Sequence, residues 1–434
     1  MLDIKSTEKE GCIRTFAYST DKFKSENISV WFVLPNERKE SVKRSLLLSV
    51  LKRGTEKYPS QKLINERLDE LYATLINIKN QKYENVQLLG ISADIINSSY
   101  TEDGGDLMPS VLDIIDQIMF HPLIDSESGM FCKEYLKSEK ENYKSIILSQ
   151  INEPRTYAAI RCREEMFSSL GIVDKLDNMC QRIDETSMQD IYNCYADLKC
   201  APIIAFYVGP RSEKEVQAML ENTFDGKKIE LNCIKNKSIK MLSKLDAPNE
   251  IIERSDISQS RLIMGLNCSV TWKDEDYYAM LLCNEILGAS PVSKLMVNVR
   301  EKLSICYECS SIYNSARGAI FVSTGIDCEN YDLAQNAIIE QIDDIKKGQV
   351  SESELVAAKK SIFNVYGAVC DSPSAIERFY LGRIINNIDV DIADFLKKID
   401  ALTLEDVKNA ANKISLHTIY LLKGESEEED EDYE

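Results

Sequence analysis

The first predicted element is a strand, and a stretch of helical periodicity follows it. Apart from Ser29, residues 28–34 are β-branched, aromatic or aliphatic, which is typical of a buried strand. Residues 40–53 place apolar side chains at helical spacing and stop at Gly54, a residue type favoured just past a helix end. A second helix and two strands are predicted next, at residues 61–71, 72–78 and 86–95.

The second half of the chain repeats this order. A strand-like run at 261–266 leads through an acidic turn into a helical stretch that stops at Gly288. A helix and two strands are again predicted, at residues 293–302, 305–312 and 318–325. Gly54 and Gly288 are 234 residues apart (288 − 54), so a duplication of nearly the whole chain is indicated.

Both halves continue with helices and close with a short apolar strand. The helical patterns cover residues 107–119, 130–150 and 154–168 in the first half and 331–346, 352–369 and 374–385 in the second. The closing strands are 203–209 and 418–422. Strands followed by a block of helices, twice over, predict an α+β fold of two homologous domains, each an antiparallel sheet covered by helices.

We expect four segments along the chain. An N-terminal domain covers residues 1–224, and a linker rich in Lys, Asn and Asp covers 225–249. A C-terminal domain covers 250–424, and an acidic tail covers 425–434.

Composition narrows the classes of partner. The 434 residues are 44% apolar and 28% charged, as in an ordinary globular protein, and the net charge of −19 argues against nucleic acid as a partner. The N-terminus lacks the basic start and apolar core of a secretory signal, and no apolar run reaches the ~18 residues of a membrane span. We therefore expect a cytoplasmic protein without a membrane partner.

The thirteen cysteines are odd in number and scattered, so free thiols are expected rather than a disulfide framework. Cys306 and Cys309 have C-x-x-C spacing. A zinc knuckle needs a second pair or nearby histidines, and a redox pair normally lies at a helix start, whereas these two lie in a predicted strand. We interpret their spacing as coincidence.

The chain lacks the residues that several kinds of enzyme chemistry require. The chain has neither a phosphate-binding G-x-x-x-x-G-K-[ST] motif nor a Gly-rich turn from strand to helix. Its only two histidines are His121, at a predicted helix end, and His417, one residue before the last predicted strand. We interpret both as structural, which disfavours serine or cysteine hydrolysis.

Residues 44–60 read R-S-L-L-L-S-V-L-K-R-G-T-E-K-Y-P-S. They resemble the region around the inverted zinc motif of the pitrilysin (insulinase-like) metallopeptidases, where H-x-x-E-H lies on a helix that runs into a Gly-Thr turn. Anchored on Gly54–Thr55, the motif falls on residues 45–49. Ser45 and Ser49 then replace the two histidines, and Leu48 replaces the glutamate.

This replacement removes the metal chemistry that the family uses. Two imidazoles at positions i and i+4 of a helix can share one zinc ion, and the glutamate can take a proton from its bound water. Serine hydroxyls are weak neutral ligands, and leucine accepts no proton. The family's third ligand is a later glutamate, for which Glu134, Glu139 and Glu141 remain open. The resemblance implies no catalytic residue and no cofactor here, with zinc only in a catalytic partner.

Residues 293–307 read S-K-L-M-V-N-V-R-E-K-L-S-I-C-Y and resemble the family signature S-x-L-x-x-x-x-R-E-x-x-x-x-x-Y. In active relatives its Arg and Tyr reach the substrate carbonyl and the transition state. The resemblance therefore implies that Arg300 and Tyr307 bind substrate. An alternative stays open, in which Arg300 and Glu301 form a solvated helix face and Tyr307 is a half-buried strand residue.

The run L-D-E-L-Y at 68–72 is similar to bacterial companion subunits of the family that lack the zinc motif, including the type associated with aminopentanol modification of elongation factor P. Three functions follow from the resemblance. The chain is a non-catalytic subunit that binds a short peptide or unfolded polypeptide beside a zinc-bearing homologue, or a homodimeric peptide-binding scaffold, or a metallopeptidase with an unorthodox site.

Overall fold

The computed structural model describes residues 5–7, 13–83, 85–102, 104–173, 175–224 and 241–424. The expected tail at 425–434 and most of the expected linker, 225–240, lie outside the described residues. Two compact units are formed: unit 1 comprises Met1–Ser145, Asp177–Lys237 and Val369–Asp391, and unit 2 comprises Ile146–Leu176, Ser238–Ala368 and Ile392–Glu434. None of the described helices is long and apolar enough to cross a lipid bilayer.

Unit 1 is built on a six-stranded sheet with strand order β1-β2-β6-β3-β5-β4. The strands are β1 Lys5–Thr7, β2 Arg14–Ser19, β3 Ser25–Pro35, β4 Leu75–Lys82, β5 Val86–Ile96 and β6 Ile203–Gly209. All neighbours are antiparallel except β2 and β6. The central strands are buried on both faces, with Trp31, Phe32 and Tyr207 at 0% exposure, so this sheet forms the core of unit 1.

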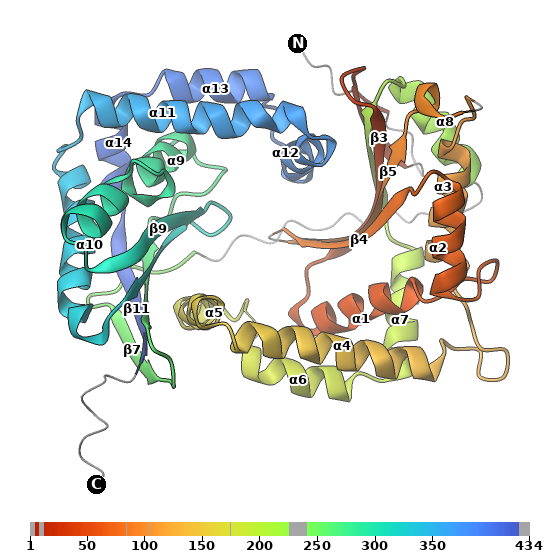
Figure 1. Cartoon of the computed structure of the whole chain (residues 1–434), viewed down its shortest axis with the longest axis horizontal. Helices are drawn as coiled ribbons and strands as arrows, with labels where there is room; N and C mark the ends of the chain where they lie inside the picture. The colour runs from red at the N-terminus through yellow and green to blue at the C-terminus, as the bar shows by residue number, and fades with distance from the viewer. Residues whose placement is uncertain are drawn as a thin grey trace, which may run out of the picture. The chain divides into compact units, whose positions relative to one another are not determined.

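Helices are packed around this sheet, some on its strands and others on those helices (Figure 1). They are α1 Ser41–Leu51, α2 Gln61–Glu70, α3 Met108–Phe120, α4 Lys133–Ile151, α6 Leu176–Glu185, α7 Met188–Lys199 and α8 Glu213–Thr223, of which α4 and α6 reach into the chain segments of unit 2. In α1 the side chains of Leu46, Leu47, Val50 and Leu51 are buried, which explains why this helix forms on the sheet.

Unit 2 has a five-stranded sheet of order β7-β11-β8-β10-β9. Its strands are β7 Asn249–Arg254, β8 Ser260–Asn267, β9 Cys306–Asn314, β10 Ala319–Ile326 and β11 Ser415–Lys423. Its helices are α9 Tyr277–Asn284, α10 Tyr331–Lys346, α11 Glu352–Gly367, α13 Ile392–Asp400 and α14 Leu404–Ala411, with two π-helical segments, η4 Glu285–Ala289 and η5 Leu295–Lys302. The ladders are antiparallel except β7 with β11.

The two sheets share one topology. The order β2-β6-β3-β5-β4 in unit 1 corresponds strand by strand to β7-β11-β8-β10-β9 in unit 2, including the single parallel ladder. The predicted α+β class and internal duplication are therefore confirmed. Each sheet is mixed rather than purely antiparallel, because strands β2 and β7, which the sequence pattern missed, run parallel to the closing strand of each repeat.

One helix of each repeat is exchanged between the units. Helices α5, Pro154–Met166, and α12, Pro373–Ile385, occupy corresponding places in the two repeats, and each carries proline in its first turn. Helix α5 belongs to unit 2, where it packs on β8 and β11, whereas α12 belongs to unit 1, where it packs on β6 and β3. The compact units thus differ from the sequence repeats at these helices. The expected domain boundaries, drawn from the repeats, stay a prediction.

Carboxylates accept the hydrogen bonds that position both exchanged helices. Glu377 of α12 is 2% exposed, accepts a hydrogen bond from Trp31 Nε1 at 2.9 Å and pairs with Lys79 Nζ at 3.0 Å. In unit 2, Glu253 of β7 accepts hydrogen bonds from Tyr157 of α5 at 2.7 Å and from Tyr420 of β11 at 2.5 Å. The buried Glu377 carboxylate is tolerated only with such partners, whereas Glu253 is half-buried, and both contacts help to specify where the helix docks.

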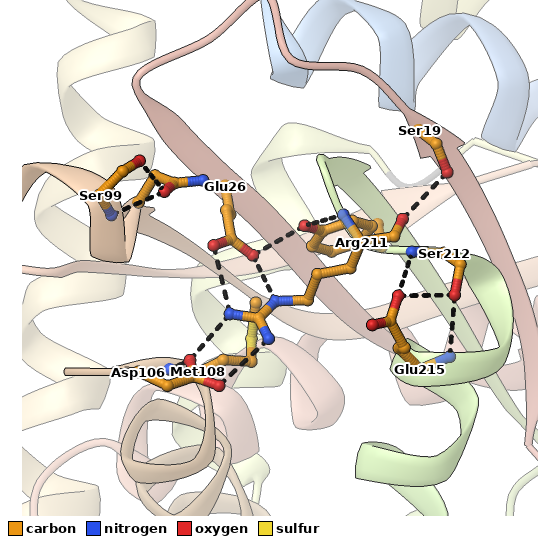
Figure 2. A network of polar contacts seen from close by, with 10 residues as sticks. Ser19, Glu26, Ser99, Asp106, Met108, Arg211, Ser212 and Glu215 are labelled. Atoms are coloured by element: carbon orange, nitrogen blue, oxygen red, sulfur yellow. Dashed lines mark hydrogen bonds and ion pairs between the residues drawn. The ribbon is translucent and has the colours of Figure 1, made fainter. Parts of the chain in front are cut away.

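A third carboxylate network links β3 and β6 of unit 1 to the loops that precede α8 and α3. Figure 2 shows the Arg211 guanidinium between the carboxylates of Glu26 and Asp106. Glu26 in β3 is 2% exposed, lies 2.7 Å from Arg211 Nε and also accepts a hydrogen bond from Tyr207 at 2.7 Å. Because every partner belongs to the fold of unit 1, we interpret this network as structural.

Two local predictions are wrong. Residues 72–78 do not form a strand throughout, because Tyr72 and Ala73 have φ of 57° and 55° and β4 begins only at Leu75. His417 lies inside β11 rather than before it, at a register irregularity between Leu416 and Thr418.

Candidate functional site

The Gly-Thr turn after α1 has a structural reason for each residue. A Cβ atom on Gly54 would lie 3.0 Å from the backbone carbonyl of Pro59, so only glycine fits without displacement. Thr55 is fully buried, and its Oγ1 accepts a hydrogen bond from the Tyr58 backbone N–H at 2.9 Å. This turn holds the loop against the end of the helix that carries residues 45–49.

Ser45 is part of a hydrogen-bonded network that ties α1 to the sheet. Its half-buried hydroxyl donates to the Ser41 carbonyl at 3.1 Å and accepts from Asn80 Nδ2 of β4 at 2.9 Å. Asn80 Oδ1 accepts from Gln87 Nε2 of β5, and Gln87 Oε1 accepts from Arg44 Nη1, both at 2.9 Å. The hydroxyl at the first histidine position is therefore already engaged on both its donor and acceptor sides.

Leu48, at the position of the family's glutamate, is a core residue. Its side chain is 3% exposed, whereas Ser49 at the second histidine position is half-buried. A leucine in this setting contributes packing and no proton transfer.

The three open glutamates differ in their surroundings. Glu134 and Glu141 of α4 are exposed, whereas Glu139 is 7% exposed and forms an ion pair with Arg53, just past the end of α1. Arg53 also donates to Ser138 Oγ at 3.1 Å. The buried carboxylate of Glu139 is thus paired with the guanidinium of Arg53. This cation would compete with a metal ion for the carboxylate.

These residues do not fit a zinc ion. The Ser45 hydroxyl is already hydrogen-bonded, the family's glutamate is replaced by Leu48, and the buried Glu139 carboxylate is paired with Arg53. Within the part of the chain that the structure describes, no group of three His, Cys, Asp or Glu side chains is arranged to hold a metal. His121 is the C-cap residue of α3, as expected for a structural histidine, with its Nε2 3.3 Å from Asp116 Oδ2.

The signature around Arg300 divides into buried and exposed positions. Ser293, Leu295 and Val299 are at most 2% exposed, so they anchor η5, which packs on β9. Arg300 is exposed, with its Nη1 3.2 Å from Met296 Sδ, and Tyr307 of β9 is 72% exposed. Both predicted substrate-binding side chains are therefore accessible on unit 2, and Tyr307 is more exposed than the half-buried alternative supposed.

The periodicity of β9 did not reveal how Tyr307 is presented. In the ladder with β10, Ile326 pairs with Cys306 and Gly325 pairs with Glu308, so Tyr307 is an extra residue without a register partner. This β-bulge turns Tyr307 outward and puts Cys306 and Cys309 on the buried face together, at 9% and 1% exposure. A single sequence carries no signal for such an insertion, because the alternation on each side of it is intact.

Comparison with known proteins assigns the family. Residues 187–362 match the family described as "Peptidase M16 inactive domain". A Bacillus subtilis (strain 168) protein named "Probable inactive metalloprotease YmfF" is 28% identical over 417 residues, which cover 96% of this chain and 97% of that relative. The resemblance of this chain to the M16, pitrilysin-like peptidases is thus confirmed. The chain is a homologue of the inactive M16 type.

Solved structures share the fold of this M16 homologue over nearly its full length. A conserved protein from Enterococcus faecalis V583 superposes with a TM-score of 0.85 at 26% identity, covering 96% of this chain and 97% of that one. A Pseudomonas fluorescens structure titled as a peptidase M16 inactive domain gives a TM-score of 0.76 at 16% identity, with 98% of each chain covered. The second of these bears on the fold alone.

Proposed function

We propose that this M16 homologue is the peptide-binding, non-catalytic subunit of a heterodimeric zinc protease. Its partner would be a zinc-bearing homologue, and its ligand a short peptide or unfolded polypeptide. The proposal places the protein in the cytoplasm, for which the support is its complement of free thiols.

One asymmetry between the units supports this proposal. In unit 1 the side chains at the zinc-motif positions serve the fold, since Ser45 is hydrogen-bonded to Asn80 and Leu48 is buried. In unit 2 the arginine and tyrosine of the family signature are retained and exposed. A chain that served only as a scaffold would have no reason to keep the second pair while losing the first.

The retained side chains suit a peptide backbone. The guanidinium of Arg300 and the phenol of Tyr307 can both donate hydrogen bonds to a carbonyl oxygen, and a charged donor also stabilises developing negative charge. The zinc-bound water and the general base would come from the other subunit, so these two side chains would bind and orient the peptide.

The test is to co-express this chain with a zinc-bearing homologue from the same cell and measure peptide cleavage by the purified complex. Arg300→Ala should lower turnover by about 1–3 kcal/mol of transition-state free energy, as for a charged hydrogen bond, without dissociating the subunits. Tyr307→Phe should act in the same direction but more weakly. Lys302→Ala is the matched control, since it removes the same charge from the same exposed helix end.

Full activity of the zinc-bearing subunit alone would contradict the proposal. So would equal effects of Arg300→Ala and Lys302→Ala. Either result would favour the homodimeric scaffold, and cleavage by this chain alone, sensitive to a chelator, would favour an unorthodox metallopeptidase.

A further inference from the structure

The spacing of Cys306 and Cys309 alone indicates coincidence, but the bulge in β9 brings these two cysteines together on one face. In a regular strand, residues three apart point to opposite faces of the sheet. Here the extra residue Tyr307 puts both cysteines on the same face of the sheet. Cys306 pairs in register with Ile326 of β10, and Cys309 pairs with Thr324, which lies two residues earlier on the same strand. Both sulfur atoms therefore face the side on which η4 and η5 pack.

We propose that Cys306 and Cys309 form an oxidisable dithiol, which closes to an intrachain disulfide when the protein meets hydrogen peroxide. The proposal needs neither a partner subunit nor a bound peptide, and it therefore stands independently of the proposed function.

Contacts between the two thiols assign them different roles. The Cys309 thiol hydrogen-bonds to the Cys306 sulfur, and this contact, with help from the Thr324 hydroxyl and the Arg300 charge, lowers the pKa of Cys306 to about 7. The same contact and burial raise the pKa of Cys309. Burial and, to a smaller extent, the Glu308 carboxylate oppose this lowering of the Cys306 pKa without reversing it.

Exposure supports the same assignment. Cys306 retains 9% of its surface and Cys309 only 1%. Cys306 is thus the more accessible of the two thiols and the one with the lowered pKa, which makes it the attacking sulfur. Cys309 is held beside it as the resolving thiol.

The chemistry balances with one peroxide molecule. The Cys306 thiolate attacks one peroxide oxygen, the O–O bond breaks, and the other oxygen takes a proton and leaves as water, so that Cys306 becomes a sulfenic acid. The Cys309 sulfur then loses its proton and attacks the Cys306 sulfur, and the S–O bond breaks with release of a second water. Two thiols are oxidised by two electrons, and the peroxide is reduced to two waters.

The full chain provides a direct readout. Trypsin releases residues 303–317, which contain Cys306 and Cys309 and no other cysteine. After native protein is treated with hydrogen peroxide and quenched, this peptide should be lighter by two hydrogen masses and resist alkylation. A dithiol reductant should restore the original mass and the alkylation of both cysteines. Oxidation should be about tenfold faster than at Cys200, an exposed cysteine outside the pair.

Two variants separate the roles. Cys309→Ser should accumulate a sulfenic acid at Cys306 that a dimedone-type nucleophile traps, whereas Cys306→Ser should leave Cys309 unlabelled. The wild-type measurement is decisive even if a variant misfolds. Retention of both thiols in peptide 303–317 while Cys200 is oxidised, or conversion of Cys306 to a sulfinic acid without linkage to Cys309, would overturn the proposal.

Discussion

At the residue scale, the side chains at the zinc-motif positions of α1 take part in the packing and hydrogen bonds of unit 1. The Ser45 hydroxyl connects the helix to β4 through Asn80, and Leu48 fills part of the core at 3% exposure. Glu139 is held by Arg53. The residues around the motif positions are thus engaged with one another, and restoring the motif alone would not supply the surroundings that orient metal ligands.

We predict that wild-type protein holds no stoichiometric zinc and that the triple variant Ser45→His, Leu48→Glu, Ser49→His is destabilised without gaining a zinc site. A glutamate at position 48 would place a carboxyl group in the packed core, where Leu48 is 3% exposed, and the larger imidazole at position 45 would displace the Ser45–Asn80 hydrogen bond. The free energy of unfolding should fall by about 3 kcal/mol or more. Elemental analysis and urea unfolding, with and without zinc, measure both effects.

The control is Ser45→Ala with Ser49→Ala, which removes both hydroxyls but adds neither volume nor charge. It should cost only about 1 kcal/mol. A triple variant that binds one zinc per chain and unfolds at the wild-type urea concentration would refute the idea that the site's surroundings have drifted.

At the element scale, the sequence predicted most helices and strands because their apolar faces are continuous. Helix α10 matches its expected range, 331–346, and β9 and β10 follow the expected strands closely. The parallel strands β2 and β7 were missed, because each is a short edge-side run whose partner, β6 or β11, lies far along the chain. The bulge at Tyr307 and the Asn80–Gln87 network were missed for the same physical reason, since they depend on register between strands.

Helix α7 offers a test of how local signals support this architecture. Its N-cap Ser187 and Asp190 form a reciprocal capping box, in which the Asp190 N–H donates to Ser187 Oγ at 3.1 Å and Asp190 Oδ2 accepts from the Ser187 N–H at 2.9 Å. Hydrogen bonds from Ser187, with Lys43 nearby, lower the pKa of Asp190 to about 2. We predict that Ser187→Ala lowers the free energy of unfolding by about 1 kcal/mol at neutral pH.

The pH dependence of this effect follows from the sign of the shift. A carboxyl group with a lowered pKa in the folded state stabilises the protein above its unfolded pKa of about 4, and that contribution is lost as the pH falls through about 2. The difference between Ser187→Ala and wild type should therefore shrink between pH 4 and pH 2 in urea unfolding. Ser126→Ala, at an exposed turn position, is the control and should change stability at neither pH.

At the scale of the whole molecule, the exchanged helices make each compact unit depend on both sequence repeats. The sheet of unit 1 is covered in part by α12, whose Tyr380 stacks on Phe206 with ring centroids 6.4 Å apart and whose Glu377 bonds Trp31. The sheet of unit 2 packs against α5 through Ala158 and Cys162. A fragment that ends in the expected linker therefore carries one helix without its sheet and one sheet without its helix.

We predict that fragments 1–224 and 241–434 do not fold stably alone but assemble when they are co-expressed. Alone, fragment 1–224 leaves the apolar face of α5 exposed and deprives the buried Trp31 indole of its Glu377 partner, and either loss is large against a typical net stability of about 5–15 kcal/mol. With a tag on one fragment only, both should copurify in equal amounts and show one cooperative thermal transition. Tyr380→Ala in the C-terminal fragment, which removes a buried ring from the α12 contact, should weaken the assembly, whereas Lys397→Ala at an exposed ion pair should not. If fragment 1–224 alone were monomeric and melted cooperatively near the wild-type temperature, then the repeats, and not the units with exchanged helices, would be the folding domains of this protein.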